Sequence, residues 1–141
     1  MKNINFKKVK ATEIQIRILY ELLKKRKFSI SNTTLPTYEN HEFFVKKNPY
    51  IVWFIVYDYE NPVGSVYLQK DNSIGINLMK ADLETVKAII DFIKLEFNPI
   101  TEVKSKVPSY FFVNVPFYNK PLSAIFKKLG ANEIQVTYKI V

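Results

Sequence analysis

Ile51-Val52-Trp53-Phe54-Ile55-Val56-Tyr57 is the stretch of sequence that decides the fold of this chain. All of its residues are apolar, and most are β-branched or aromatic, which favours extended backbone over helix. A continuous apolar run of this length is typical of a strand that is buried on both faces of a sheet. The stretch therefore predicts a central strand with other elements packed against both of its sides.

The residues that follow this strand predict a meander of three antiparallel strands. The segment 58–62 has turn chemistry, so residues 63–69 should pair back on the central strand as a hairpin. Lys70-Asp71-Asn72 turns the chain again into residues 74–79. The middle of the chain is therefore expected to supply the core of the sheet.

The flanking sequence predicts four helices and three further strands. The expected elements are a strand at 3–10, helices capped by Thr12 and Thr37, a long helix capped by Asp82, a strand at 110–115, a helix capped by Asn119 and an alternating strand at 134–140. This order indicates an α/β fold of the α+β type, in which four helices flank a mixed central sheet. No linker or repeat divides the chain, so we expect a single domain over residues 1–141.

The first helix has the clearest local signals. Thr12-Glu13-Ile14-Gln15 fits a capping box, and the helix is expected to run to about Lys27. Its apolar residues recur at helical spacing, which predicts one apolar stripe along the helix. The residues of that stripe are Ile14, Ile18 and Leu22, with Leu19 and Leu23 beside them.

Composition excludes several functional classes. The 141 residues include no cysteine and one histidine, which argues against a disulfide scaffold, a zinc ribbon, a cysteine nucleophile or a histidine-based metal cluster, and no metal-ligand spacing is present. The longest apolar run is too short to cross a membrane, and the opening MKNINFKKVK has no apolar segment typical of a secretory signal. We expect a soluble, cytoplasmic protein that does not bind membranes.

The charge is concentrated at one end of the chain. The formal net charge is +8, of which residues 1–50 carry +7 (eleven Lys or Arg against four Asp or Glu). Only Arg17 and Arg26 are arginine among the 21 basic residues. Base recognition favours the planar fork of arginine, so we expect no specific nucleic-acid binding. The basic N-terminal third could still bind another anionic partner.

The order of elements resembles the GNAT superfamily of N-acetyltransferases. The resemblance is most specific in the segment from Asn119 to Ala131, where an asparagine precedes a helix and the glycine of a Lys-Leu-Gly ending follows eleven residues later. The segment 36–53 is also similar to bacterial members of that family. The resemblance implies a sheet whose fourth and fifth strands splay apart, with acetyl-CoA bound in the gap.

The resemblance also implies the cofactor-binding residues. The pantetheine arm would lie along Asn77, Leu78 and Met79, and Asn119 would reach the cofactor from the other side of the gap. Lys80 would lie near the diphosphate. The backbone N–H groups near Leu78 and Met79 would polarise the thioester carbonyl.

The catalytic candidates are His41 and Tyr118. His41 titrates near neutrality and could deprotonate the acceptor amine, with water as the alternative base. Many members of the family carry a tyrosine seven residues after the asparagine, which protonates the departing thiolate. This position is Phe126 here, so Tyr118 is the candidate general acid. The implied reaction transfers acetyl from acetyl-CoA to a primary amine of a small molecule or amino sugar.

One departure from the family pattern supports a second hypothesis. Only Lys80 and Ala81 separate Met79 from the Asp82 cap, and the glycines that usually surround the diphosphate are absent. Asp82 and Glu84 place carboxylates at that position instead. The alternative is a catalytically degenerate GNAT-fold binding module with a basic N-terminal surface. The oligomeric state is open, with a homodimer as one alternative.

Overall fold

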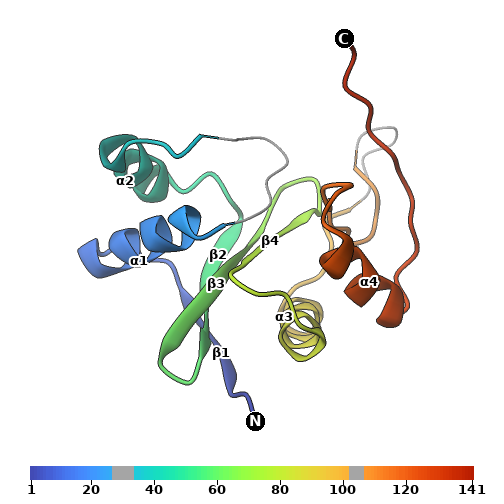
Figure 1. Cartoon of the computed structure of the whole chain (residues 1–141), viewed down its shortest axis with the longest axis horizontal. Coiled ribbons are helices and arrows are strands. Elements are labelled where there is room, and N and C mark those ends of the chain that lie inside the picture. Colours follow the sequence, from blue (N-terminus) through green and yellow to red (C-terminus); the bar gives the residue numbers. More distant parts are fainter. Residues whose placement is uncertain (27–33, 102–106) are drawn as a thin grey trace.

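The computed structural model describes residues 1–26, 34–101 and 107–141 of the chain. Its elements follow the predicted order through the meander and the long helix (Figure 1). They are β1 (Ile4–Lys8), α1 (Glu13–Lys24), α2 (Tyr38–Lys47), β2 (Val52–Asp58), β3 (Asn61–Leu68), β4 (Ile74–Leu78), α3 (Leu83–Glu96) and α4 (Lys120–Lys128). The part of the chain that is described contains no helix with the length and apolarity needed to cross a membrane.

The four strands form one antiparallel sheet in the order β1-β2-β3-β4. β2 is an inner strand: Phe54 lies opposite Lys8 of β1 and Val66 of β3. The register shifts between Val56 and Tyr57, at an irregularity next to the β2–β3 turn. The meander is thus confirmed, and its last strand, β4, lies at the edge of the sheet.

Both faces of β2 are buried, as the apolar run predicts. Trp53, Ile55 and Tyr57 point to the face that α1 and α2 cover, where they form one core cluster with residues of those helices. Val56 belongs to the cluster on the opposite face, together with Ile89 and Ile93 of α3. Figure 1 shows α1 and α2 on one side of the sheet and α3 on the other. Alternation along β2 therefore places helices on both sides.

α4 packs against α3 in a third cluster. Leu122 and Ile125 of α4 contact Val86 of α3, which is completely buried. The helix begins and ends as expected, since Asn119 caps it and Gly130 has a positive φ of 85° after its last turn. The α3–α4 contact fixes the first turn of α4 beside the end of β4.

The apolar stripe expected on α1 is confirmed in part, because Leu19 is buried and Ile18 and Leu22 pack against the same core cluster. The buried residues are Ile16 and Leu19, whereas Ile14 is 73% exposed. Helical periodicity alone predicts an apolar stripe but not which stripe faces the sheet, and α1 has apolar residues on two adjacent faces. The helix also ends at Lys24, with Lys25 as its C-cap, and Lys27 lies outside the described residues.

Two predicted strands do not form continuous strands. Residues 110–115 make a single parallel bridge to the sheet, between Phe112 and Ser73, before they diverge from β4. Residues 131–141 form no strand, and every one of them is exposed. A strand needs a neighbouring backbone edge to pair with, and sequence alternation does not supply one.

The close approach of β3 and β4 depends on Gly64. A Cβ atom at this position would lie 2.2 Å from the carbonyl oxygen of Asn77 in β4. We predict that Gly64→Ala lowers the free energy of unfolding by about 1–3 kcal/mol, because one of the two strands must shift. Chemical denaturation of the purified variant measures this change.

The matched control is Ser65→Ala, which adds no atom at the neighbouring buried position. We expect it to cost about 1 kcal/mol or less. A Gly64→Ala variant as stable as the wild type would contradict the observed packing of β3 on β4.

Candidate functional site

A cavity of about 210 Å³ lies at the outer edge of β4. It lies along residues 76–78 of β4, beyond the bridge between Ser73 and Phe112. Its lining comes from the end of α1, from β4 and the turn that follows, and from the start of α4. The lining residues are Arg26, Ile76, Asn77, Leu78, Met79, Lys80, Ala81, Asn119, Pro121 and Leu122.

The backbone of β4 presents hydrogen-bonding groups to this cavity. The Ile74 N–H donates to Phe112 O (2.8 Å), so Ile74 points its N–H to the outer edge. Alternate residues of a strand use the same edge, and the N–H groups of Ile76 and Leu78 therefore also point outward. The Met79 N–H instead donates to Val63 O (3.0 Å). The backbone N–H groups of Leu78 and Met79 are the two expected donors to a ligand. The N–H of Leu78 points toward the cavity, whereas the N–H of Met79 is already bonded within the sheet.

The far wall of the cavity is the first turn of α4. The side-chain oxygen of Asn119 accepts a hydrogen bond from Leu122 N–H (3.3 Å), which caps the helix. Its amide NH₂ group is the part of the side chain that can donate to a ligand. Pro121 is tolerated in this first turn because its missing N–H would have no helical partner there.

Arg26 adds a cation that the sequence alone did not place at the site. It follows α1, and its Nη1 atom donates to Asn77 Oδ1 of β4 (3.4 Å). Arg26 and Asn77 are separated by 51 positions in sequence, so no local pattern connects them. Arg26 and Lys80 give the cavity two positive side chains in its lining.

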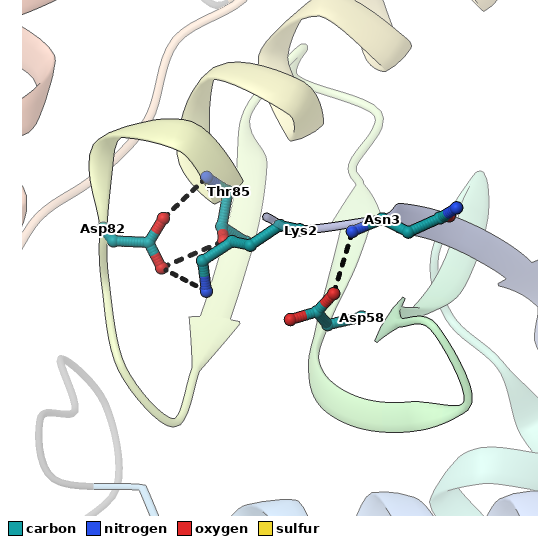
Figure 2. Close-up of polar contacts among 5 residues, drawn as sticks. All are labelled: Lys2, Asn3, Asp58, Asp82 and Thr85. Atoms are coloured by element: carbon teal, nitrogen blue, oxygen red, sulfur yellow. Dashed lines mark hydrogen bonds and ion pairs between the residues drawn. The ribbon is translucent and has the colours of Figure 1, made fainter.

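The N-terminus of α3 lies immediately after the cavity residues Lys80 and Ala81. Asp82 caps the helix by accepting hydrogen bonds from the Thr85 N–H (2.9 Å) and the Thr85 hydroxyl (3.0 Å). Lys2 forms an ion pair with the same carboxylate at 3.2 Å (Figure 2). The carboxylate thus already satisfies an N–H group that diphosphate would otherwise bind.

The charge state of this cap follows from its contacts. Partial burial raises the pKa of Asp82, but hydrogen bonds from Thr85 and Lys2 outweigh it and hold this pKa below its usual value. The same contact raises the pKa of Lys2. Asn3, next to Lys2, donates its backbone N–H to Asp58 Oδ1 (2.9 Å), as Figure 2 also shows. The start of the chain is therefore anchored at two points.

The structure brings the predicted cofactor-binding residues together. One cavity is lined by Asn77, Leu78, Met79, Lys80 and Asn119. In sequence, 38 positions lie between Lys80 and Asn119. Their binding of acetyl-CoA stays a prediction. Tyr118, which is 44% exposed and packs edge-to-face on Phe117, precedes Asn119 but does not line the cavity.

His41 lies elsewhere, on the face of α2 that packs against α1. It is 3% exposed, its Nε2 atom lies 2.9 Å from Ile16 O, and its ring packs against Tyr20 and Tyr38. A carbonyl only accepts, so the neutral ring carries its proton on Nε2. Burial lowers the pKa of His41, and the hydrogen bond to Ile16 offsets this in part. These contacts explain its position as a core residue.

A second, more open cavity of about 480 Å³ runs along the exposed apolar side of α1. Ile14, Ile18 and Leu22 line it together with Pro62 and Met79, although Ile18 and Leu22 also pack against the core cluster. Met79 borders both cavities. Within the described residues, no group of three or more acidic or histidine side chains is placed to hold a metal ion.

Comparison with known proteins defines the fold class. No family model matches the sequence, and no curated protein matches it. The structure is similar to a domain from Methanocaldococcus jannaschii DSM 2661, with a TM-score of 0.66 and 16% identity over 96% of this chain and 92% of that one.

Two similar structures belong to acetyltransferases by description. One is a possible acetyltransferase from Clostridium difficile 630 (TM-score 0.56, 11% identity, 98% of both chains). The other is a GNAT-family acetyltransferase from Streptococcus pneumoniae TIGR4 (TM-score 0.51, 12% identity, 99% of this chain and 98% of that one). The α+β fold of this chain is therefore GNAT-like, which confirms the predicted fold class.

The buried neutral His41 predicts acid sensitivity. Because its pKa is lowered in the folded protein, the unfolded chain binds this proton first as the pH falls below about 6.5. The free energy of unfolding is therefore not reduced by His41 above about pH 6.5. Below this pH it falls, by up to about 1.4 kcal/mol at pH 5.5. Denaturation curves at pH 7.5 and 5.5 measure the loss.

His41→Gln keeps a donor for the Ile16 carbonyl but removes the titrating ring. We expect the variant to lose less stability than the wild type between the two pH values. Equal losses in both proteins would contradict the assignment of a neutral, buried His41. A lower rate of acetyl transfer in a folded His41→Gln variant would instead favour its role as the base.

Proposed function

We propose that the protein transfers an acetyl group from acetyl-CoA to a primary amine of a small molecule or amino sugar. The observation that carries the proposal is the splayed outer edge of β4, where backbone N–H groups and a cavity meet. An extended pantetheine arm carries amide groups that can pair with such an edge as a strand would. The GNAT-like fold supports the same location.

The chain's residues suggest how acetyl transfer would proceed. The amine nitrogen attacks the thioester carbon, the C–S bond breaks, and the CoA thiolate leaves as the new C–N amide bond forms. The outward N–H of Leu78 would donate to the carbonyl oxygen as negative charge develops there. His41 is buried away from the cavity, so the geometry favours water as the base that receives the amine proton.

The thiolate needs a proton as it leaves. Tyr118, next to Asn119 at the start of α4, is the candidate donor because its phenol carries an acidic proton and its ring is partly exposed. Phe126, which is partly buried and packs against the α3–α4 cluster, has no proton to supply. Tyr118→Phe should lower kcat without weakening acetyl-CoA binding.

Asp82 favours the second candidate function, a GNAT-fold binding module that has lost acetyl transfer. Its carboxylate occupies the N-terminus of α3, where diphosphate would otherwise find unpaired N–H groups. Lys2 neutralises this carboxylate and brings a cation to the same helix end. The two candidate functions therefore differ in whether cations offset the acidic cap enough for acetyl-CoA to bind.

Ligand-dependent thermal stability distinguishes these functions. If acetyl-CoA binds, a concentration one hundred times its Kd adds about 2.7 kcal/mol to the free energy of unfolding. We expect a higher Tm with acetyl-CoA and a smaller shift with acetate at equal concentration. No shift at millimolar acetyl-CoA would contradict the acetyltransferase proposal and support the binding module.

A charge reversal in the cavity tests where acetyl-CoA binds. Lys80→Glu should weaken binding by about tenfold, because it replaces attraction to the phosphates with repulsion. Lys70→Glu makes the same charge change in the β3–β4 turn, outside the cavity lining, and should leave Kd within about twofold. Isothermal titration calorimetry measures both. Equal effects would place the ligand elsewhere.

Removal of the acidic cap should have the opposite effect. Asp82→Ser keeps a side chain that can cap α3 but removes the carboxylate, so we predict tighter acetyl-CoA binding by about threefold to tenfold. Asp91→Ser, in an exposed part of α3, removes the same charge and is the control. Weaker binding by Asp82→Ser, with the fold intact, would show that the carboxylate assists the ligand.

A further inference from the structure

The C-terminal segment carries several exposed apolar side chains that the proposed function does not use. Residues 131–141 leave α4 as an extended chain, and Figure 1 shows them running away from the helix to the free C-terminus. The exposed fractions of their large apolar side chains are high. They are 58% for Ile134, 71% for Val136, 80% for Tyr138 and 89% for Ile140.

These residues alternate strictly in character. The apolar side chains occupy the even positions from 134 to 140, while Glu133, Gln135, Thr137 and Lys139 occupy the odd ones. Such alternation is typical of a strand with one buried and one solvated face. The segment has the sequence of a sheet strand but makes no strand pairing within the described chain.

The segment is complementary to itself when two copies run antiparallel. With Val136 opposite Val136, Glu133 lies opposite Lys139, Ile134 opposite Tyr138 and Gln135 opposite Thr137. By twofold symmetry, each of these pairs occurs twice. Directly opposed side chains share a face, so the opposite charges meet, as do the apolar side chains of residues 134, 136 and 138.

No neighbouring register matches the charges in this way. In a register centred on Gln135, Glu133 would lie opposite Thr137. In a register centred on Thr137, Lys139 would lie opposite Gln135. A shift by one residue would place apolar side chains on the polar face. The register centred on Val136 is therefore the one that pairs Glu133 with Lys139 while Ile134, Val136 and Tyr138 stay on the apolar face; it places Ile140 opposite Asn132.

We propose that residues 132–140 form an interface with a second copy of this chain, as an antiparallel two-stranded ribbon around a twofold axis at Val136. The ribbon pairs backbone groups that the single chain leaves to water. Two strands alone are only marginally stable, so the dimer dissociates on dilution. The proposal does not rest on acetyl transfer, because none of the segment lines the acetyl-CoA cavity.

Contacts within one chain compete only weakly with this pairing. Glu133 forms an ion pair with Lys127 of α4 at 3.1 Å, and Gln135 Nε2 donates to Thr137 Oγ1 at 3.3 Å. Both ion-pair partners are largely exposed, where such pairs contribute little to stability. Lys139 forms no ion pair that the described residues show.

Sedimentation equilibrium of the full chain, from about 10 µM to about 1 mM, tests the association. We expect a monomer–dimer equilibrium in the wild type and a monomer after deletion of residues 132–141. A wild type that stays monomeric, including one whose segment folds back on its own chain, would overturn the proposal. A dimer that survives the deletion would overturn it as well.

Charge exchange tests the register. Lys139→Glu places like charges at both Glu133 positions and should raise the dimer Kd by about tenfold. Glu133→Lys should act similarly, although it also removes the pair with Lys127. The double variant exchanges the charges and should restore the wild-type Kd to within about threefold. Failure of this restoration would contradict the register.

Disulfide trapping gives a second measurement, because the chain has no native cysteine. In this register two Val136→Cys residues face each other at about 4.5–5.5 Å between Cα atoms, which a disulfide can bridge. Thr137→Cys is the control, since its two copies would be diagonal neighbours about 7–8 Å apart. Mild oxidation should link Val136→Cys at least about tenfold faster. Equal linking would overturn the twofold at Val136.

Discussion

The structure depends on the burial of β2 from both sides. Its odd-numbered residues, such as Ile55, contact α1 and α2, and its even-numbered residues, such as Val56, contact the α3 side; both side chains are fully buried. A strand of this kind must lie inside a sheet with helices on each face. The meander then carries β4 to the sheet edge, and α3 must begin immediately beyond it. The position of the candidate site follows from these constraints.

The candidate site arises because β4 is paired over only part of its outer edge. The bridge at Phe112 satisfies the start of the strand, and the next residues turn away, so the N–H groups of Ile76 and Leu78 face a cavity. Cations from three distant parts of the chain, Lys2, Arg26 and Lys80, lie at or next to this end of β4. The Asp82 carboxylate repels an anionic ligand, whereas these cations attract it. We propose that the balance of these charges decides whether acetyl-CoA binds.

Local signals predicted what depends on local physics. The double-sided strand, the caps at Thr12, Asp82 and Asn119, and the left-handed Gly130 all require only neighbouring residues, and the structure has each of them. The buried face of α1 and the contacts of Lys2 and Arg26 depend on how distant elements pack, so the sequence could not supply them. The alternation at 134–140 predicted a strand that the described chain does not form, because a sequence pattern does not supply the backbone edge with which a strand must pair.

The central proposal is that acetyl-CoA binds along the outer edge of β4. A titration of the ¹⁵N-labelled protein with acetyl-CoA, followed by amide NMR shifts, tests this most directly. We predict the largest shifts at Ile76 and Leu78 and in the first turn of α4, with small shifts at His41. An absence of shifts, or shifts confined to Ile14 and Ile18 in the α1 cavity, would contradict the account.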